Sequence, residues 1–434
     1  MSLAQSTFFG ENETRKELER LRNQAFIANA VKYRKNPILT VGSPGSWDDA
    51  AVVSADVIKY GNTYYMFYGG NNRADGKWRT GLALSNDGIN WVKYQNNPVI
   101  NVGTVYDTVF AVIIGNCITY DKSLGKWVMF YQSWTGGTAY ITISRAESYD
   151  LLHWTKRDDV NPVLSSTSGH MKPVGIVYDQ ESSEYVLYVN FADNTIQRYV
   201  SSNGISFTFD RNVNVVKPQE YDSLSYEMTL QKIGRLYILE AHALRLNAWE
   251  IILFLSYDGV NFFPYARNPI LTTYPKRGNA WDTSGVVFPF IFYEEDKIWL
   301  YYTGFTTYTS PFLWQIGLAF LNQAIFERLT DVIAIYGWNN TSISAGASAS
   351  IIFPINLLGY DTKSLYFGSS ATGNLTISVD PIGDGNFTSI STSSNISSAN
   401  QLIDYDFAYL QLTFSNTSTV TATVTARLVA GRKK

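Results

Sequence analysis

The sequence predicts an all-β protein: a five-bladed β-propeller, then a C-terminal β-sandwich, with one short helix at the N-terminus. Three observations lead to this prediction. The phrase Ser-x-(Asp/Asn)-(Gly/Leu)-x-x-(Trp/Phe) occurs four times, at steps of 63, 53 and 55 residues. A second phrase, Asn-Pro-(Ile/Val)-(Leu/Ile), precedes four units of similar length. Beyond Arg328 the composition changes abruptly. A repeat of about this length, made of short strands, is typical of a propeller.

Residues 1–35 are expected to hold the helix and a segment that closes the ring. Residues 11–30 have an amphipathic pattern in which Leu18 and Leu21 share one face. Either this helix braces the propeller rim, or it serves attachment or oligomerisation. The fifth repeat unit lacks the Ser-x-Asp phrase. Because a closed ring leaves no unpaired strand edge, we expect the missing outer strand to come from the chain before Asn36.

The five predicted blades occupy residues 36–328. Each blade begins with the Asn-Pro phrase or a degenerate form of it, then has an apolar inner strand, a turn and a strand rich in Tyr and Phe. The Ser-x-Asp phrase is expected to form a tight hairpin, because Asp or Asn accepts hydrogen bonds from its own turn and Gly supplies a positive φ. The aromatic residue that follows then packs between neighbouring sheets. Asp87, Asp150 and Asp258 are therefore interpreted as scaffold residues.

Residues 329–434 predict the separate β-sandwich. From residue 331 onward the chain has no Glu, His or Cys and is rich in Ser, Thr and Asn. Runs with alternating polarity, such as Leu375 to Val379, indicate strands with one dry face. Since it lacks clusters of titratable groups, this part is expected to bind, anchor or assemble, for instance on a cell surface or a virion.

The bulk composition excludes some partners. A net charge of −3 and a pI of about 5.7 give no electrostatic basis for binding nucleic acid or an anionic membrane. No apolar run approaches the roughly 20 residues of a transmembrane helix. Aromatic residues reach 15% and charged residues only 16%, which suits a glycan-contacting, extracellular or surface-associated protein. No signal-peptide core is visible at the N-terminus. The single cysteine, Cys117, has no partner for an internal disulfide.

The loops into the inner strands carry a third repeat, an aromatic residue followed by Asp. It occurs as Trp47-Asp48, Tyr106-Asp107, Tyr221-Asp222 and Trp281-Asp282. Two interpretations remain open: a ring of carboxylates around a sugar site, or a hydrogen-bonding staple that each blade reuses.

Polar residues outside the repeat are the stronger site candidates. Asp49 follows Asp48 only in the first blade, and Glu227 falls within an inner strand. A carboxylate there faces the axial channel or the core, where an unpaired charge is costly. Two of the three histidines, His170 and His242, fall on segments expected to face the same end of the propeller.

Residues 36–328 resemble the five-bladed propellers of glycoside hydrolase families 43, 32, 68, 117 and 130. The resemblance rests on Trp47-Asp48, the strand from Val57 to Gly70, the Asn-Pro phrases and the Ser-x-Asp turns, which are similar to the Asp-box turn of propeller glycosidases. In families 43 and 32, three carboxylates lie on the first three inner strands. The resemblance implies that one acts as base or nucleophile, one is an Asp that orients the reacting groups, and one is a Glu that acts as acid. At those places this chain has Ser54-Ala55, Gly115-Asn116 and Lys172-Pro173.

We therefore expect a carbohydrate-active protein, and the first hypothesis is a glycoside hydrolase whose carboxylates have moved. The relocated set would be Asp48 or Asp49 with Asp107 and Glu227, acting on a poly- or oligosaccharide at the axial mouth. The predicted substrate-binding residues are Arg73, Trp134, His170, Glu240, His242, Asp282 and Trp314. The alternatives are a non-catalytic glycan-binding module and a purely structural propeller. No cofactor is expected; some relatives bind Ca²⁺ near the axis, but no spacing here is specific for a metal site.

Overall fold

The computed structural model describes two stretches of the chain, residues 30–321 and 332–431, with gaps. The gaps are residues 168, 180–182, 192–194, 226, 234–235, 257, 266–267, 274–280, 295–296, 307–312, 353–361, 381–387, 403–408 and 421. The predicted N-terminal helix falls before Ala30 and so lies outside the described residues. Within them every regular element is a strand, and no helix is long and apolar enough to cross a membrane. The chain divides into two compact units, residues 1–255 with 267–322, and residues 256–266 with 323–434.

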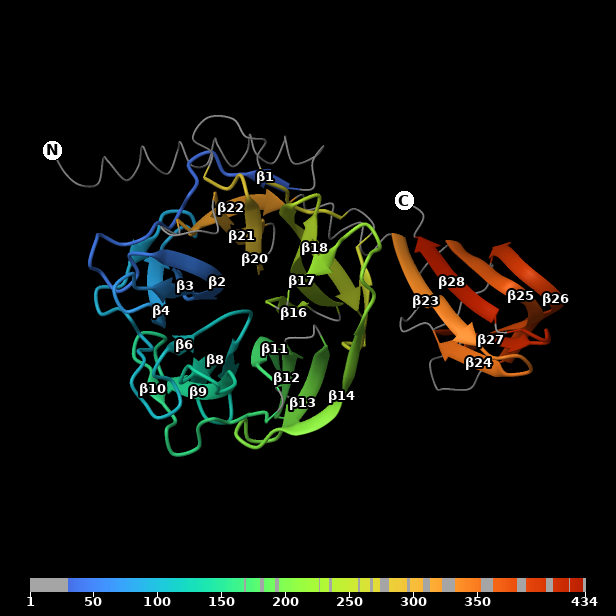
Figure 1. Cartoon of the computed structure of the whole chain (residues 1–434), viewed down its shortest axis with the longest axis horizontal. Coiled ribbons are helices and arrows are strands. Elements are labelled where there is room, and N and C mark those ends of the chain that lie inside the picture. The colour runs from blue at the N-terminus through green and yellow to red at the C-terminus, as the bar shows by residue number, and fades with distance from the viewer. Residues whose placement is uncertain are drawn as a thin grey trace. The chain divides into compact units, whose positions relative to one another are not determined.

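The strands of the first unit form antiparallel groups that follow one another along the chain, and Figure 1 shows them arranged around a common centre. Groups one and two contain β2 (Ala51–Tyr60), β3 (Thr63–Asn71), β4 (Trp78–Ser85) and β5 (Val92–Lys93), then β6 (Phe110–Val112), β7 (Ile118–Asp121), β8 (Lys126–Trp134), β9 (Thr142–Ser148) and β10 (Thr155–Lys156). Group three contains β11 (Met171–Asp179), β12 (Glu184–Phe191), β13 (Ile196–Ser201) and β14 (Thr208–Val215).

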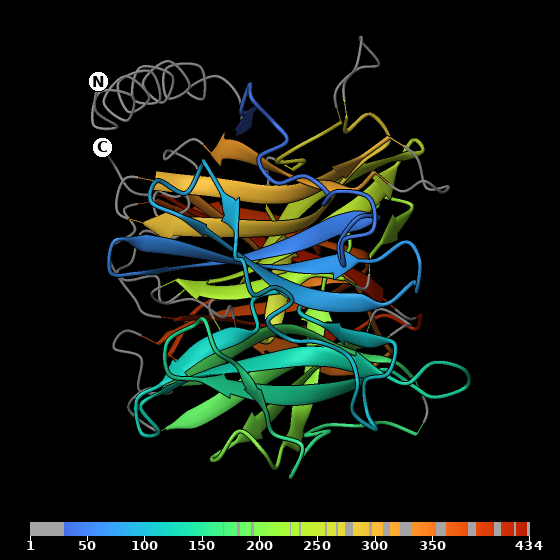
Figure 2. The ribbon, with the colours of Figure 1, turned by 90° about the vertical axis from the view of Figure 1, so that its left-hand side faces the viewer.

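Group four contains β15 (Ser223–Leu224), β16 (Thr229–Ile233), β17 (Leu236–Arg245) and β18 (Ala248–Ser256), and β19 (Asn261–Pro264) follows in the chain. Group five contains β20 (Gly285–Glu294), β21 (Lys297–Phe305), β22 (Gln315–Leu321) and β1 (Ala30–Lys32). In Figure 2 group one, in blue, lies between group five, in gold, and group two, in teal.

The N-terminal strand β1 completes group five. It pairs antiparallel with β22, with Ala30 opposite Leu321 and Lys32 opposite Ala319. The backbone N–H of Tyr33 continues the pairing by donating to the Leu318 carbonyl at 2.8 Å. The prediction that the outer strand of the last unit comes from the chain before Asn36 is confirmed.

The asparagine side chain of each Asn-Pro phrase pairs with a strand through two hydrogen bonds, as the backbone of a further strand residue would. The Asn97 side chain accepts the Leu82 N–H at 2.8 Å and donates to the Leu82 carbonyl at 2.8 Å. The same double bond joins Asn161 to Arg145, Asn268 to Leu253 and Asn36 to Leu318. Only a side-chain amide offers a donor and an acceptor in this arrangement, which explains why asparagine recurs at this place.

Replacing Asn161 by alanine is expected to lower the free energy of unfolding by about 2 kcal/mol. The substitution leaves the buried N–H of Arg145 without its partner, and its carbonyl keeps only the Arg157 N–H; an unsatisfied buried group costs about 1–3 kcal/mol before relaxation. Urea unfolding of the full chain measures the loss. The control is Asn96→Ala, which changes the same residue type at an exposed position. Equal midpoints for the two variants would contradict the expectation.

The Ser-x-Asp phrases form the predicted turns. In the first copy Gly88, at φ 72°, donates its N–H to Ser85 Oγ at 2.9 Å, while Asp87 accepts the N–H groups of the next two residues at 2.9 and 2.8 Å. The other three copies repeat these bonds. Leu151 takes the glycine position at φ 66° in the second copy. Asp87, Asp150 and Asp258 thus have the scaffold role predicted for them, and Asn203 has the same role in the third copy.

The aromatic residue after each turn packs against the preceding group. Trp154 of the second copy lies edge-on to Phe67 of group one, with ring centroids 5.6 Å apart. Phe207 of the third copy makes the same contact with Phe130 of group two, also at 5.6 Å. The predicted packing of this ring between neighbouring sheets is confirmed.

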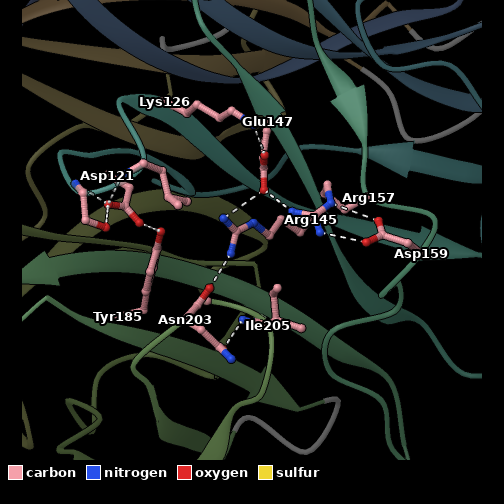
Figure 3. Close-up of polar contacts among 12 residues, drawn as sticks. Asp121, Lys126, Arg145, Glu147, Arg157, Asp159, Tyr185, Asn203 and Ile205 are labelled. Atoms are coloured by element: carbon pink, nitrogen blue, oxygen red, sulfur yellow. Dashed lines mark hydrogen bonds and ion pairs between the residues drawn. The ribbon is translucent and has the colours of Figure 1, made fainter.

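A buried polar network also ties group two to group three (Figure 3). The Arg145 guanidinium donates to the carbonyl of Asn203 at 2.7 Å and lies 3.0 Å from the Glu147 carboxylate. Glu147 also accepts bonds from Lys126 and Arg157. The buried charge of Arg145 is thus partly compensated by the Glu147 carboxylate and the Asn203 carbonyl.

The second unit is a β-structure of its own. Its strands are β23 (Val332–Ile343), β24 (Ser348–Ile352), β25 (Thr362–Asp380), β26 (Thr388–Leu402), β27 (Tyr409–Asn416) and β28 (Ala422–Gly431). They form one antiparallel network in the order β23-β28-β25-β27-β24, with β26 on β25. Leu375, Leu412 and Phe414 are buried in it. The alternating pattern of the sequence thus forms strands as predicted, whereas the two-layer sandwich stays a prediction.

Candidate functional site

The first residues of the inner strands meet at one end of the propeller, which we call the entry end. Three contacts between neighbouring groups define it: Trp78 pairs with Phe110, Trp249 with Gly285, and Ala51 with Trp314. The loops that carry the repeated Asp residues lead into this end. All predicted site residues lie in the described part of the chain, so their surroundings can be compared.

Three repeated Asp residues form staples inside their own groups. Asp48 is 2% exposed; its carboxylate accepts the Tyr68 hydroxyl at 3.0 Å and the Lys93 ammonium at 2.6 Å. Lysine and tyrosine come from the outer and second strands of the group. The side chain is thus surrounded by protein.

Asp107 and Asp282 repeat this arrangement. Asp107 binds the Tyr131 hydroxyl at 3.3 Å and the Lys156 ammonium at 2.6 Å. Asp282 binds the Tyr302 hydroxyl at 3.1 Å and the Lys32 ammonium at 2.7 Å. Both carboxylates are fully buried. The fourth copy differs, because Asp222 is exposed. Of the two interpretations left open by the sequence, the staple describes the geometry of these three residues.

Asp49 holds the loop of its own group. Its carboxylate accepts the backbone N–H of Arg73 at 2.7 Å and that of Gly45 at 2.8 Å. These bonds to the ionised form lower the pKa of Asp49. The Arg73 guanidinium is exposed and donates to the Asp49 carbonyl at 3.3 Å. Asp49 and Arg73 therefore lie together, on the group-one side of the entry end.

Glu227 forms an ion pair that the sequence did not predict. Its carboxylate lies 2.6 Å from the ammonium of Lys172, the second residue of β11. The Lys172 side chain is 8% exposed and that of Glu227 is 22% exposed. This pair joins groups three and four at the entry end. Lys172 stands at the place where the family resemblance implies an acid Glu.

Two histidines lie beside Lys172. His170 accepts the Ile141 N–H through Nδ1 at 2.8 Å, and its ring centroid is 6.3 Å from that of Trp134. Burial lowers the pKa of His170, and the charge of Lys172 lowers it further. His242 is buried, and the same two causes lower its pKa to about 3, so it is neutral at pH 7. The predicted residues Glu227, His170 and His242 are thus brought together around Lys172.

Glu240 lies in the interior, not on a surface. Its carboxyl accepts the Gln231 amide at 2.6 Å and the Ile291 N–H at 2.8 Å, and it is fully buried. Burial raises its pKa to about 8, with a further contribution from the charge of Asp56. Burial also raises the pKa of Asp56 to about 7; one oxygen accepts the Cys117 N–H at 3.0 Å, and the other has no partner in the described part of the chain.

The rest of the entry end is apolar. Trp314, Trp78, Phe110 and Trp249 are partly buried and pack on a buried cluster that includes Phe288. Trp314 stacks on Phe305 with ring centroids 4.9 Å apart. His242 connects the two sides, because its ring lies 5.1 Å from Trp249 and 5.4 Å from Phe288. An aromatic half and a polar half therefore adjoin at the entry end.

Sequence reasoning missed Lys172 and Asn190 as site residues. The signal was a further repeat position on the second long strand of each group, close to the entry end. Its residues in the five groups are Gly69, Gln132, Asn190, His242 and Thr303. Four of the five are polar. Among the residues that the structure describes, no group of three or more His, Cys, Asp or Glu side chains is placed to hold a metal ion.

Comparison with known proteins identifies the fold. No family model matches the chain. Two uncharacterised proteins of Mycobacterium tuberculosis, from strains CDC 1551 and H37Rv, are each 29% identical over 132 residues, which is 29% of this chain and 43% of theirs. The match thus spans less than half the length of these relatives.

Solved structures give the wider likeness. A glycoside hydrolase covers 70% of this chain and 94% of its own, with 12% identity and a TM-score of 0.51. A structure described as a candidate glycosidase of Bacteroides thetaiotaomicron covers 68% and 97%, with 14% identity and a TM-score of 0.52. The first unit of this chain therefore has a glycosidase-like propeller fold.

Proposed function

We propose that this protein binds a carbohydrate at the entry end of the propeller, between the aromatic half and the Lys172–Glu227 pair. The observation that carries the proposal is the adjacency of these halves, which His242 joins. A sugar ring has an apolar C–H face and a rim of hydroxyl groups. Sites for such ligands combine aromatic surfaces with a few fixed polar groups.

The contacts of the carboxylates favour recognition over hydrolysis. Glycoside hydrolysis needs one protonated and one ionised carboxyl group on either side of the scissile bond. Asp48 and Asp107 are buried against lysine and tyrosine, and Asp49 is bonded to backbone N–H groups. The acids with raised pKa values, Asp56 and Glu240, are buried in the interior. Glu227 is the remaining candidate, and it lacks a second exposed carboxyl partner among these residues.

Replacing Glu227 by glutamine is expected to weaken glycan binding at least tenfold. The substitution replaces the charged acceptor that fixes the Lys172 ammonium by a neutral one, and hydrogen bonds to charged groups contribute about 1.5–3 kcal/mol each. Binding is measured on an immobilised panel of arabinan, xylan, fructan, mannan and galactan, with mass spectrometry of released sugars in parallel.

The matched control is Glu294→Gln. Glu294 pairs with Lys59 between groups five and one, at the opposite end of the inner strands, and its side chain is 21% exposed. Binding by the wild type and the control but not by Glu227→Gln supports the proposal. Equal loss in both variants would count against the entry end, and released sugars would establish hydrolysis instead.

We also propose the finer architecture that the sequence predicts. The strand groups correspond to five blades over residues 36–328, and the second unit corresponds to a sandwich over residues 329–434. The regular pairing within each group and the closure by β1 support five blades. The Ser- and Thr-rich second unit fits a role in anchoring or assembly outside the cell, on a cell surface or a virion.

A further inference from the structure

One repeat position at the entry end satisfies a backbone amide of the next group in two of the groups. In group five Thr303 Oγ1 accepts the N–H of Ser54 at 3.1 Å, across the boundary with group one. In group four His242 Nδ1 accepts the N–H of Phe288 at 3.4 Å, across the boundary with group five. Ser54 and Phe288 have φ values of 54° and 47°, because the inner strand bulges there and turns its N–H outward.

Asn190 has the same position in group three but not the same bond. The corresponding stretch of group four is residues 225–228, and there the Glu227 N–H donates to Ser225 Oγ at 3.1 Å. Asn190 is 0% exposed, and neither its amide nitrogen nor its amide oxygen has a partner among the described residues. In group two the buried Gln132 likewise has an amide nitrogen that no described residue accepts.

The Asn190 amide adjoins the Lys172–Glu227 pair. Asn190 lies directly opposite Lys172 in the β11–β12 register. Side chains of residues directly opposite each other in an antiparallel pair stand on the same face, with Cβ atoms about 5 Å apart. Lys172 extends from that position to Glu227 at 2.6 Å. The Asn190 amide, with one acceptor oxygen and two N–H donors, therefore lies beside the Lys172 ammonium and the Glu227 carboxylate.

Leaving a buried amide without hydrogen bonds costs roughly 1–3 kcal/mol per group. Native proteins almost always satisfy such groups with protein, ordered water or ligand. In groups four and five this position binds a backbone amide, whereas both amide functions of Asn190 are without a partner in the described part of the chain, so its full hydrogen-bonding capacity can serve a ligand.

We propose that Asn190, with Lys172 and Glu227, binds two adjacent hydroxyl groups of a sugar. One hydroxyl donates to Asn190 Oδ1 and the next accepts from Asn190 Nδ2. The Lys172 ammonium then donates to the first hydroxyl, and the Glu227 carboxylate accepts from the second. A carboxylate or carbonyl only accepts, so it would leave Oδ1 unsatisfied. A neutral sugar with adjacent hydroxyls therefore fits this set better than an acidic sugar. This inference rests on the proposed binding of carbohydrate at the entry end.

Saturation-transfer NMR on the full chain tests the inference. The probes are methyl α-D-mannopyranoside and methyl β-D-galactopyranoside, which have adjacent hydroxyls, and 1,3-propanediol, which has none. The wild type is expected to bind at least one pyranoside and to ignore the propanediol. Asn190→Leu, which keeps the volume and removes both amide functions, is expected to bind the pyranoside at least tenfold more weakly. Asn212→Leu, at an exposed position of the same group, is the control and should bind as the wild type does.

Each outcome decides the matter. Wild-type affinity in Asn190→Leu overturns the inference, and so does equal binding of propanediol or the absence of any pyranoside binding by the wild type. If thermal unfolding shows that Asn190→Leu is not folded, Asn190→Asp, which keeps the acceptor and loses both donors, must show the same loss. Polysaccharide binding that depends on Glu227 but not on Asn190 would leave the proposed function standing and remove this inference alone.

Discussion

Replacing Lys32 by methionine is expected to lower the free energy of unfolding of the propeller by about 3–5 kcal/mol. Lys32 belongs to β1, the strand that closes group five, and its buried ammonium lies 2.7 Å from the fully buried Asp282 carboxylate. The other Asp282 oxygen has no partner within the described part of the chain. Methionine leaves that carboxylate as an unpaired buried charge, and breaking a buried pair from one side has a cost of this size.

The chain supplies a graded control for this prediction. Lys93 has the same role toward Asp48 in group one, but its side chain is 28% exposed and it closes no ring. Lys93→Met is expected to cost about 1 kcal/mol, in the range of a solvent-screened pair. Urea unfolding followed by tryptophan fluorescence compares the two variants. Equal losses would show that burial and ring closure add nothing to the staple.

Replacing Asp56 by asparagine is expected to remove much of the loss of stability that occurs as pH rises from about 4 to about 7. Burial raises the pKa of Asp56 to about 7, whereas an unfolded aspartate titrates near 3.8. The folded state therefore keeps a proton that the unfolded state releases. The stability that this proton contributes is present in full below about pH 4 and is lost as pH rises to about 7. The loss amounts to about 4 kcal/mol. Asparagine has no proton to lose.

Thermal unfolding between pH 5 and pH 8.5 measures this effect. Glu240, whose pKa of about 8 has the same cause, gives a parallel loss that persists in the variant. His242 acts in the opposite sense: with a pKa lowered to about 3, it destabilises the folded state only as pH falls below about 6.5. The control is Asp75→Asn, since Asp75 is exposed. The expectation fails if the melting temperature falls by the same amount in Asp56→Asn and in the control between these pH values.

The sequence predicted the local features well because they lie within a few residues of one another. The Ser-x-Asp turns bond inside a span of six residues, and the Asn-Pro phrases recur at fixed positions before each unit. The propeller fold follows from these repeats. The closure by β1 followed from the missing turn of the last unit together with the need to pair a strand edge.

The partners of the candidate site residues could not be predicted in the same way. The lysines that hold Asp48, Asp107 and Asp282 lie 45, 49 and 250 residues away in the chain. Lys172 and Glu227 are 55 residues apart and belong to different groups. Which cation meets which carboxylate depends on strand register and on the neighbouring group. The residue types alone therefore could not decide between a hydrogen-bonding staple and a ring of carboxylates around a sugar site.

The most direct test of glycan binding at the entry end is hydrogen–deuterium exchange on the full chain, with and without the polysaccharide that it retains on the panel. Binding there predicts slower exchange in peptides that span residues 171–176 and 223–230, and unchanged exchange in residues 332–431. Protection confined to residues 332–431 would assign carbohydrate binding to the second unit and contradict a site in the propeller.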